Sequence, residues 1–169
     1  NGGYGSRTVV GGAGFLLNNE MDDFSVKPGV PNMYGAVGTD ANAIAPGKRM
    51  LSSMTPTIVF KDNKPYLIVG TPGGTTITTS VFQTLINILE FDMNAFDAVN
   101  KPKFHHQWLP DVIYVEPDFS TAVRSELEKM GYKVSSRGQI GRTEVIRILP
   151  DGKIEAVGDK RGDDHAAGY

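Results

Sequence analysis

The sequence predicts an α+β fold, because two strand pairs stand on either side of a strongly apolar helical segment. Residues 57–60 and 66–69 are apolar runs joined by a short polar turn, which is typical of a hairpin. Residues 144–148 and 153–157 flank a Pro-Asp-Gly turn and indicate a second hairpin. Neither an internal repeat nor a dividing linker stands between these elements, so we expect a single domain over residues 1–169.

The first fifty residues are predicted to be mostly irregular. Residues 8–17 alternate between small and apolar side chains and indicate one or two short strands. Residues 18–50 show little periodicity and contain many proline and glycine residues. An irregular stretch of this length inside a compact domain is usually a functional loop, so binding groups are expected there.

A buried helix is predicted directly after the first hairpin. Ile77, Val81 and Leu85 fall on one face at helical spacing, and Ile88 continues that face. Threonine and isoleucine near its start are poor helix formers, so burial must stabilise it. We therefore expect this helix inside a layered fold.

The segment between that helix and the second hairpin carries smaller elements. The pattern predicts a short helix over residues 94–99 and a strand over residues 112–115. A third helix is expected to bury a stripe of three apolar side chains and to end at Gly131. The expected stripe consists of Val123, Leu127 and Met130.

Composition narrows the classes of function. Of the 169 residues 40% are hydrophobic and 21% are charged, so the chain can bury a core. The net charge is −2 and no lysine or arginine cluster exceeds two residues, so a nucleic-acid partner is not expected. No apolar run is long enough to span a bilayer, so no direct membrane contact is expected. Without cysteine, disulfides and thiol catalysis are excluded.

An acidic turn at residues 18–24 has two interpretations. It could form an ammonium-binding corner, in which Glu20 or Asp23 faces the positive charge and an amide supplies further contacts. It could also be a solvated turn capped by short polar side chains, and this segment taken alone favours the solvated turn. Ser52 and Ser53 pose the same choice between ordinary turn chemistry and a carboxylate-binding pair. A buried strand directly follows the serines, which would hold a binding group firmly and favours the functional interpretation.

Gly73 and Gly74 follow a buried strand and precede the buried helix. They could simply allow a tight turn, or their N–H groups could form an oxyanion hole for acyl transfer. The spacing fits neither a dinucleotide fingerprint nor a phosphate-binding loop.

His105 and His106 would point to opposite faces of a strand, so no metal site is expected, and polar residues packed under Trp108 are favoured instead. No Ser-His-Asp arrangement or activated nucleophile stands out.

Five motifs in this order resemble the small subunit of the gamma-glutamyltranspeptidases, over the full length of the chain. They are residues 14–25, residues 46–57, residues 72–74, residues 104–110 and the ending from 159 to 169. The resemblance implies an N-terminal nucleophile hydrolase with a four-layer αββα sandwich that a large subunit completes. A self-cleaved proenzyme, a threonine nucleophile whose own α-amino group is the base, and no cofactor are also implied.

The resemblance also implies roles for individual residues. Gly73 and Gly74 correspond to the oxyanion hole, and Ser52 and Ser53 to the serines that hold the α-carboxylate of the gamma-glutamyl donor. The residues around its α-ammonium correspond to Asn1, Glu20 and Asp23, and the lid loop over the pocket to residues 28–39 with Tyr34. The catalytic threonine is expected upstream of Asn1. We therefore expect residues 1–169 to be a processed or truncated chain that is inactive alone.

Three functions follow as hypotheses. The first is part of a heterodimeric gamma-glutamyltransferase that acts on glutathione or related compounds, in the periplasm or outside the cell. The second is a cephalosporin acylase of the same superfamily, but a glutaryl group offers no cation to Glu20 and Asp23. The third is a degenerate, non-catalytic domain. A threonine at a self-cleavage junction upstream of the chain separates the third from the others.

Overall fold

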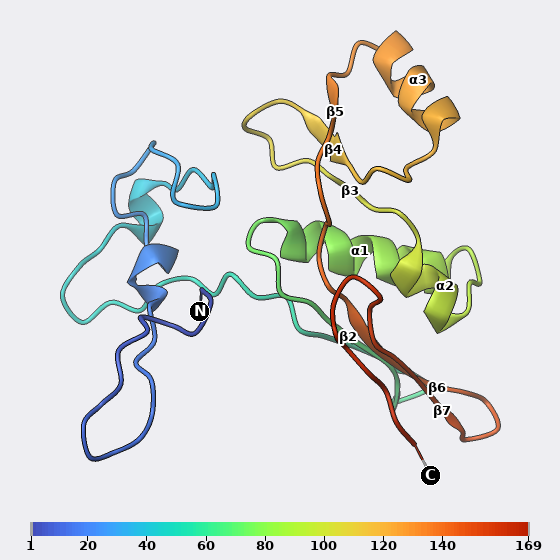
Figure 1. Cartoon of the computed structure of the whole chain (residues 1–169), viewed down its shortest axis with the longest axis horizontal. Coiled ribbons are helices and arrows are strands. Elements are labelled where there is room, and N and C mark those ends of the chain that lie inside the picture. Colours follow the sequence, from blue (N-terminus) through green and yellow to red (C-terminus); the bar gives the residue numbers. More distant parts are fainter. Residues whose placement is uncertain (1, 169) are drawn as a thin grey trace. The chain divides into compact units, whose positions relative to one another are not determined.

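The computed structural model describes residues 2–168 and divides into two compact units, one ending at Ser53 and the other beginning at Met54 (Figure 1). We refer to them as the N-terminal unit and the C-terminal unit. Asn1 lies outside the described residues, so its predicted role is not addressed by the structure. The expectation of one domain over residues 1–169 stays a prediction.

The N-terminal unit is largely irregular, as expected. The helical elements within residues 2–53 are two short 3-10 helices, η1 (Glu20–Asp23) and η2 (Asp40–Asn42). The strands predicted within residues 8–17 are reduced to one isolated antiparallel bridge between Val9 and Leu16. Both side chains of that bridge are exposed, so no apolar face is buried to stabilise a longer ladder.

A four-stranded antiparallel sheet forms the base of the C-terminal unit, in the order β1-β2-β6-β7. The strands are β1 (Thr57–Lys61), β2 (Lys64–Gly70), β6 (Glu144–Ile148) and β7 (Ile154–Val157). Asp62 and Asn63, which join β1 to β2, have φ angles of 52° and 60°. Two successive left-handed residues are what a two-residue hairpin turn requires. Both predicted hairpins are confirmed.

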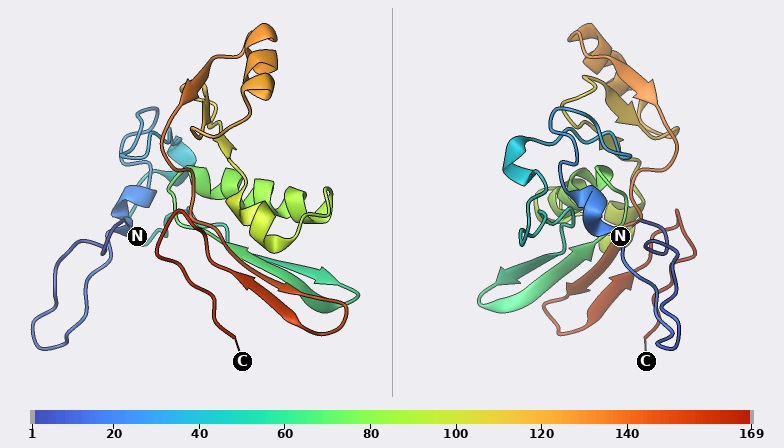
Figure 2. Two further views of the ribbon diagram at one scale, coloured as in Figure 1. Left: turned by 45° about the vertical axis from the view of Figure 1, so that its right-hand side comes forward. Right: turned by 90° about the vertical axis from the view of Figure 1, so that its left-hand side faces the viewer.

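Helices α1 (Thr76–Leu89) and α2 (Ala95–Asn100) cover one face of this sheet (Figure 2). Strand side chains Leu67, Val69 and Val145 pack there against Val81 and Ile88 of α1. The first predicted helix is therefore buried as expected. Asn94 accepts a hydrogen bond from the backbone N–H of Asp97 and so caps α2.

The other face of the sheet carries an apolar row across all four strands. Register pairs Ile58 with Ile68, Ile68 with Ile146, and Ile146 with Ala156. Ile58 and Ile146 are exposed in this chain. No helix of the C-terminal unit lies on this side in either view of Figure 2. A sheet with one uncovered apolar face is half of a sandwich.

A second, smaller sheet consists of β3 (Phe104–His105), β4 (Ile113–Val115) and β5 (Val134–Ser136), and α3 (Thr121–Lys129) connects its parallel pair β4–β5. The buried stripe predicted for α3 is wrong. None of its residues is buried, and Val123 is 48% exposed. Strands of two or three residues form too small a surface to cover a helix. The predicted end at Gly131 is confirmed by its φ of 93°.

Four buried charged side chains tie the C-terminal residues to the smaller sheet. The Glu116 carboxylate accepts hydrogen bonds from Arg161 Nε at 2.6 Å and from the backbone N–H groups of Lys103 and Ile140. Asp159 accepts from Arg161 Nη1 at 3.0 Å and from the backbone N–H of Thr143 at 2.7 Å. Lys103 Nζ donates to the Val99 carbonyl and lies 3.9 Å from Asp159 Oδ2. Burial lowers the pKa of Lys103 to about 8. Two negative and two positive side chains therefore balance each other's charge in the interior.

Among the described helices none has the length and apolar character needed to cross a membrane.

Candidate active site

The acidic turn and the serine pair meet in the N-terminal unit. Ser53 Oγ donates to Asp23 Oδ1 at 2.5 Å, across 30 positions of sequence. Asn42 makes this approach possible, because its side chain donates to the Asp23 carbonyl at 2.7 Å and accepts from the Leu51 N–H at 3.1 Å. The structure thus brings together one predicted ammonium-binding acid and one predicted carboxylate-binding hydroxyl.

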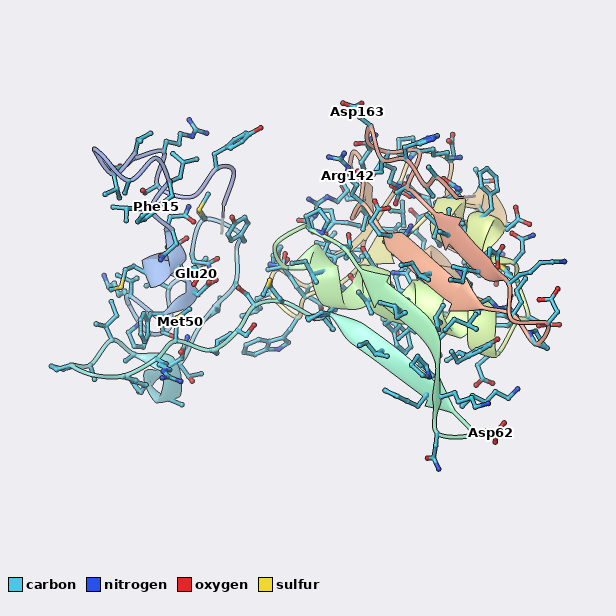
Figure 3. The ribbon with its side chains drawn as sticks, turned by 90° about the horizontal axis from the view of Figure 1, so that it is seen from below. Phe15, Glu20, Met50, Asp62, Arg142 and Asp163 are labelled. Atoms are coloured by element: carbon cyan, nitrogen blue, oxygen red, sulfur yellow. The ribbon has the colours of Figure 1, made fainter. Side chains whose placement is uncertain are left out.

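Glu20 and Ser52 are the sequence neighbours of this contact. Glu20 begins η1, and Figure 3 shows it on that helix. Its N–H donates to Asn18 Oδ1 at 3.1 Å. Ser52 precedes Ser53 directly and is exposed. A carboxylate beside a row of hydroxyl groups can face both ends of a zwitterion.

A cavity of about 430 Å³ opens beside Asp23 and Ser53. Its wall is mixed, with apolar side chains and a few polar groups from η1, the lid loop and the segment near Ser53. Among the lining residues are Asp23, Phe24, Lys27, Val30, Met33 and Ser53. This size and this lining suit a small molecule with charged groups at one end.

Asn32 organises residues 28–39, the predicted lid loop. Its Oδ1 accepts from the N–H groups of Tyr34 at 2.9 Å and Ala36 at 3.0 Å, and its own N–H donates to the Ala36 carbonyl. Tyr34 reaches the neighbourhood of Gly2, where a Cβ would lie 3.3 Å from the tyrosine hydroxyl. The Gly2 N–H donates to Asn19 Oδ1 at 2.8 Å, which holds the start of the chain beside Glu20.

In the C-terminal unit, Gly73 and Gly74 form the turn between β2 and α1. Their φ angles of 146° and 58° are accessible to glycine but rarely to other residues, which explains why glycine occupies both positions. Within residues 2–168 neither glycine N–H donates a hydrogen bond, whereas the Gly73 carbonyl accepts from Thr76 Oγ1 at 2.8 Å. Unpaired N–H groups at the start of a 14-residue helix favour a negative charge.

The backbone of this turn is fastened to the loop before β6. The Arg142 N–H donates to Thr71 Oγ1 at 2.7 Å, and the Arg142 guanidinium pairs with Asp164. Arg142 and Asp163 lie at the same edge of the C-terminal unit (Figure 3). The carboxylates of Asp164 and Asp163 raise the pKa of Arg142 further above its ordinary value. Such fastening keeps the two N–H groups in place.

The histidine pair is separated as expected, but its surroundings differ from the prediction. His105 is buried, and burial lowers its pKa. Its ring contacts Thr79 Oγ1 and Gln107 Oε1, whereas Trp108 is 71% exposed, so polar packing beneath Trp108 is wrong. Within the part of the chain that is described, no three acidic or histidine side chains gather as a metal site.

Two groups of candidate residues are thus defined, one in each unit. That they line a common cavity stays a prediction. The organising asparagines, Asn32 and Asn42, were not predicted from the sequence, although asparagine is a recognised turn residue.

Comparison with known proteins decides the family. Residues 1–169 match the sequence profile described as Gamma-glutamyltranspeptidase. The chain belongs to the gamma-glutamyltranspeptidase family. It is 51% identical over 167 residues to the glutathione hydrolase proenzyme of Escherichia coli (strain K12), covering 98% of this chain and 29% of that protein. The chain therefore spans less than a third of the length of that relative.

Solved structures of the gamma-glutamyltranspeptidase family share the fold. The T380A mutant of the Helicobacter pylori enzyme superposes with a TM-score of 0.91 at 49% identity, over 96% of this chain and 89% of that one. A cephalosporin acylase from Bacillus halodurans gives a TM-score of 0.85 at 26% identity, over 99% of this chain and 30% of that one. The predicted α+β class with the N-terminal nucleophile hydrolase architecture is confirmed.

Proposed function

We propose that this chain supplies the donor pocket and the oxyanion hole of a gamma-glutamyltransferase, which cleaves gamma-glutamyl amides such as glutathione by hydrolysis or transpeptidation. The contact of Ser53 with Asp23 carries the proposal, because it joins an acid and a hydroxyl at one small-molecule cavity. The family relationship and the named relatives support the same substrate class.

The donor's zwitterionic end fits the groups of the N-terminal unit. Glu20 and Asp23 compensate its α-ammonium, and Asn1 adds an amide. The hydroxyls of Ser52 and Ser53 donate to its α-carboxylate. Ser53 is free to do so because a hydroxyl rotates and Asp23 then accepts from the ammonium instead. Tyr34 closes the lid loop over the donor.

The chemical step uses the glycine turn. A threonine hydroxyl from outside these 169 residues adds to the γ-carbonyl carbon and passes its proton to the threonine's own α-amino group. The carbonyl oxygen becomes negative and accepts from the N–H groups of Gly73 and Gly74. Collapse expels the amine, which takes up that proton, and leaves a threonine ester. Water or an acceptor amine then adds to the ester and releases the gamma-glutamyl group.

The active protein requires a partner in this proposal. The row Ile58, Ile68 and Ile146 would pack against a second sheet, supplied by the large subunit of the same proenzyme. These 169 residues alone are expected to be inactive. A periplasmic or extracellular location is part of the proposal and follows from the family analogy.

Two alternatives have distinct signatures. A cephalosporin acylase is favoured by the 0.85 TM-score but opposed by the acids at 20 and 23, since a glutaryl group carries no ammonium. A whole enzyme that cleaves glutaryl amides faster than gamma-glutamyl amides would establish it. A residue other than threonine at the upstream junction would establish a degenerate domain.

Asp23→Asn in the whole processed enzyme tests the function. Loss of the carboxylate leaves the ammonium without its counter-charge, so kcat/KM for a gamma-glutamyl anilide should fall on the order of 100-fold. Asp40→Asn, an exposed acid on η2, is the matched control and should change nothing. Residual cleavage of a glutaryl anilide should be unaffected by either change. Full activity of Asp23→Asn would refute the proposed pocket.

A further inference from the structure

A buried hydrogen-bonded chain links α1 to the segment after β3. Thr79 Oγ1 lies 2.8 Å from His105 Nδ1, and His105 Nε2 lies 2.9 Å from Gln107 Oε1. Gln107 Nε2 in turn donates to the Leu109 carbonyl at 3.0 Å. His105 is 1% exposed, so water does not compete for its two ring nitrogens.

The Thr79 hydroxyl has one proton, which can go either to His105 Nδ1 or to the Thr76 carbonyl, so the order of donors and acceptors is set from the Gln107 end. Because the amide nitrogen of Gln107 faces a carbonyl, its oxygen faces His105 and requires an N–H there. His105 therefore carries its proton on Nε2. Burial lowers the pKa of His105 and so favours the neutral ring, in which Nδ1 accepts the Thr79 hydroxyl proton and the Thr76 carbonyl does not. The imidazole thus works as a fixed spacer between helix and loop.

A second side chain of α1, Gln83, binds the neighbouring residue of β3, Phe104. Gln83 Nε2 donates to the Phe104 carbonyl at 2.7 Å, and Gln83 Oε1 accepts from the Phe104 N–H at 3.0 Å. Gln83 lies one helical turn after Thr79, so two successive turns of α1 hold two successive residues of β3. The polar side chains fix the distance between α1 and β3.

The Thr79 end of this hydrogen-bonded series lies close to the glycine turn. Thr79 and Thr76 lie one helical turn apart in α1, and Thr76 donates to the Gly73 carbonyl through both its N–H and its hydroxyl. The first turn of α1 therefore stands between His105 and the Gly73–Gly74 peptide. Movement of that turn would displace the two unpaired N–H groups.

We propose that His105 is a positioning residue, which acts through Thr79 to hold the first turn of α1 and with it the N–H groups of Gly73 and Gly74. This inference rests on the proposed function, because it assigns His105 to the oxyanion hole of that site. It gives the buried histidine a role that requires neither a metal nor proton transfer.

Thr79→Val in the whole processed enzyme tests the proposal, since valine keeps the shape and removes the hydroxyl. A misplacement of 1 Å costs on the order of 100-fold in rate, so a partial shift should lower kcat for a gamma-glutamyl anilide about tenfold. KM should stay within about twofold, because the donor pocket is unchanged. Thr79→Ser, which restores the hydroxyl, should recover kcat to within about twofold.

Thr84→Val is the matched control. Thr84 lies on α1, is fully buried, and its hydroxyl has no hydrogen-bond partner within the described residues, so kcat should not change. An equal loss of kcat in both valine variants, or none in Thr79→Val, would overturn the inference while leaving the proposed function standing. Absence of any gamma-glutamyl cleavage by the unaltered enzyme would overturn both.

A second measurement needs no variant. Long-range ¹H–¹⁵N correlation spectra of the unaltered enzyme report which nitrogen of each histidine is protonated. The expected result for His105 is the neutral form with the proton on Nε2. A proton on Nδ1 alone would contradict the donor order and overturn the inference.

Discussion

The N-terminal and C-terminal units of this chain reach order by different means. Among residues 2–53 of the N-terminal unit only Phe24 and Ser25 are buried, and hydrogen bonds of the Asn32 and Asn42 side chains hold the backbone. In the C-terminal unit, α1 and α2 seal one face of an antiparallel sheet over a continuous core. The groups proposed to recognise the donor thus stand on locally braced loops, and the proposed oxyanion turn stands on a packed scaffold.

The largest expected effect concerns the uncovered face of the C-terminal sheet. Ile146→Asp places a charge in the middle of the apolar row, where a partner sheet would have to desolvate it. Co-expression followed by size-exclusion chromatography should show that the large subunit no longer associates. Phe82→Asp, at an exposed apolar site on α1, should leave assembly intact. Assembly that survives Ile146→Asp would show that this face is not the interface.

The next effect concerns the buried charges of the C-terminal unit. Arg161→Leu leaves Glu116 and Asp159 without their main partner, which should lower the free energy of unfolding by about 3–5 kcal/mol. Arg124→Leu removes an exposed pair with Glu128 and should cost about 0.5 kcal/mol or less. Denaturant titration of the whole protein compares the two. Equal losses would mean that the cluster contributes no more than a surface pair.

The elements of the C-terminal unit were not all equally predictable from the sequence. The β1–β2 hairpin was predictable because Asp62 and Asn63 are residue types that favour a tight turn. Helix α1 was predictable because its apolar residues recur at regular helical spacing. The charge cluster was not, because Lys103 and Arg161 are 58 positions apart (161 − 103) and each resembles a surface residue in the sequence. The error on α3 has the opposite cause, since its apolar spacing is real but the small sheet beneath it is not large enough to bury it.

The candidate site shows the same division. Glu20, Asp23, Ser52 and Ser53 were named from motifs, and the structure places Asp23 and Ser53 in contact. The asparagines that bring them together were missed, because an asparagine in a loop has many uses and only its partners distinguish them. His105 was correctly separated from His106, but its link to Thr79 requires the helix and the strand to be placed in space.

A pH-dependent effect isolates Lys103 within the same cluster. Its pKa is lowered from 10.5 to about 8 in the folded protein, chiefly by burial. Between these values the unfolded chain binds more protons, so this group makes the free energy of unfolding rise with pH, by up to about 3 kcal/mol. Stability measured from pH 7.5 to 10.5 should rise more in the unaltered protein than in Lys103→Met. Parallel curves would contradict the lowered pKa.

The smallest effect belongs to the N-terminal unit and tests the contrast most directly. Asn32→Ala removes the acceptor shared by the Tyr34 and Ala36 N–H groups, at about 1 kcal/mol for each lost hydrogen bond. The lid loop should then close less often, and KM for a gamma-glutamyl anilide should rise about five- to tenfold while kcat changes little. Asn32→Asp replaces the amide oxygen by a carboxylate oxygen, which is also an acceptor, and should restore KM. Thermal unfolding of the C-terminal unit should be the same in all three proteins, because Asn32 is not a member of that unit's core. A fall in the unfolding temperature that accompanies the rise in KM would mean that the two units are stabilised together rather than separately.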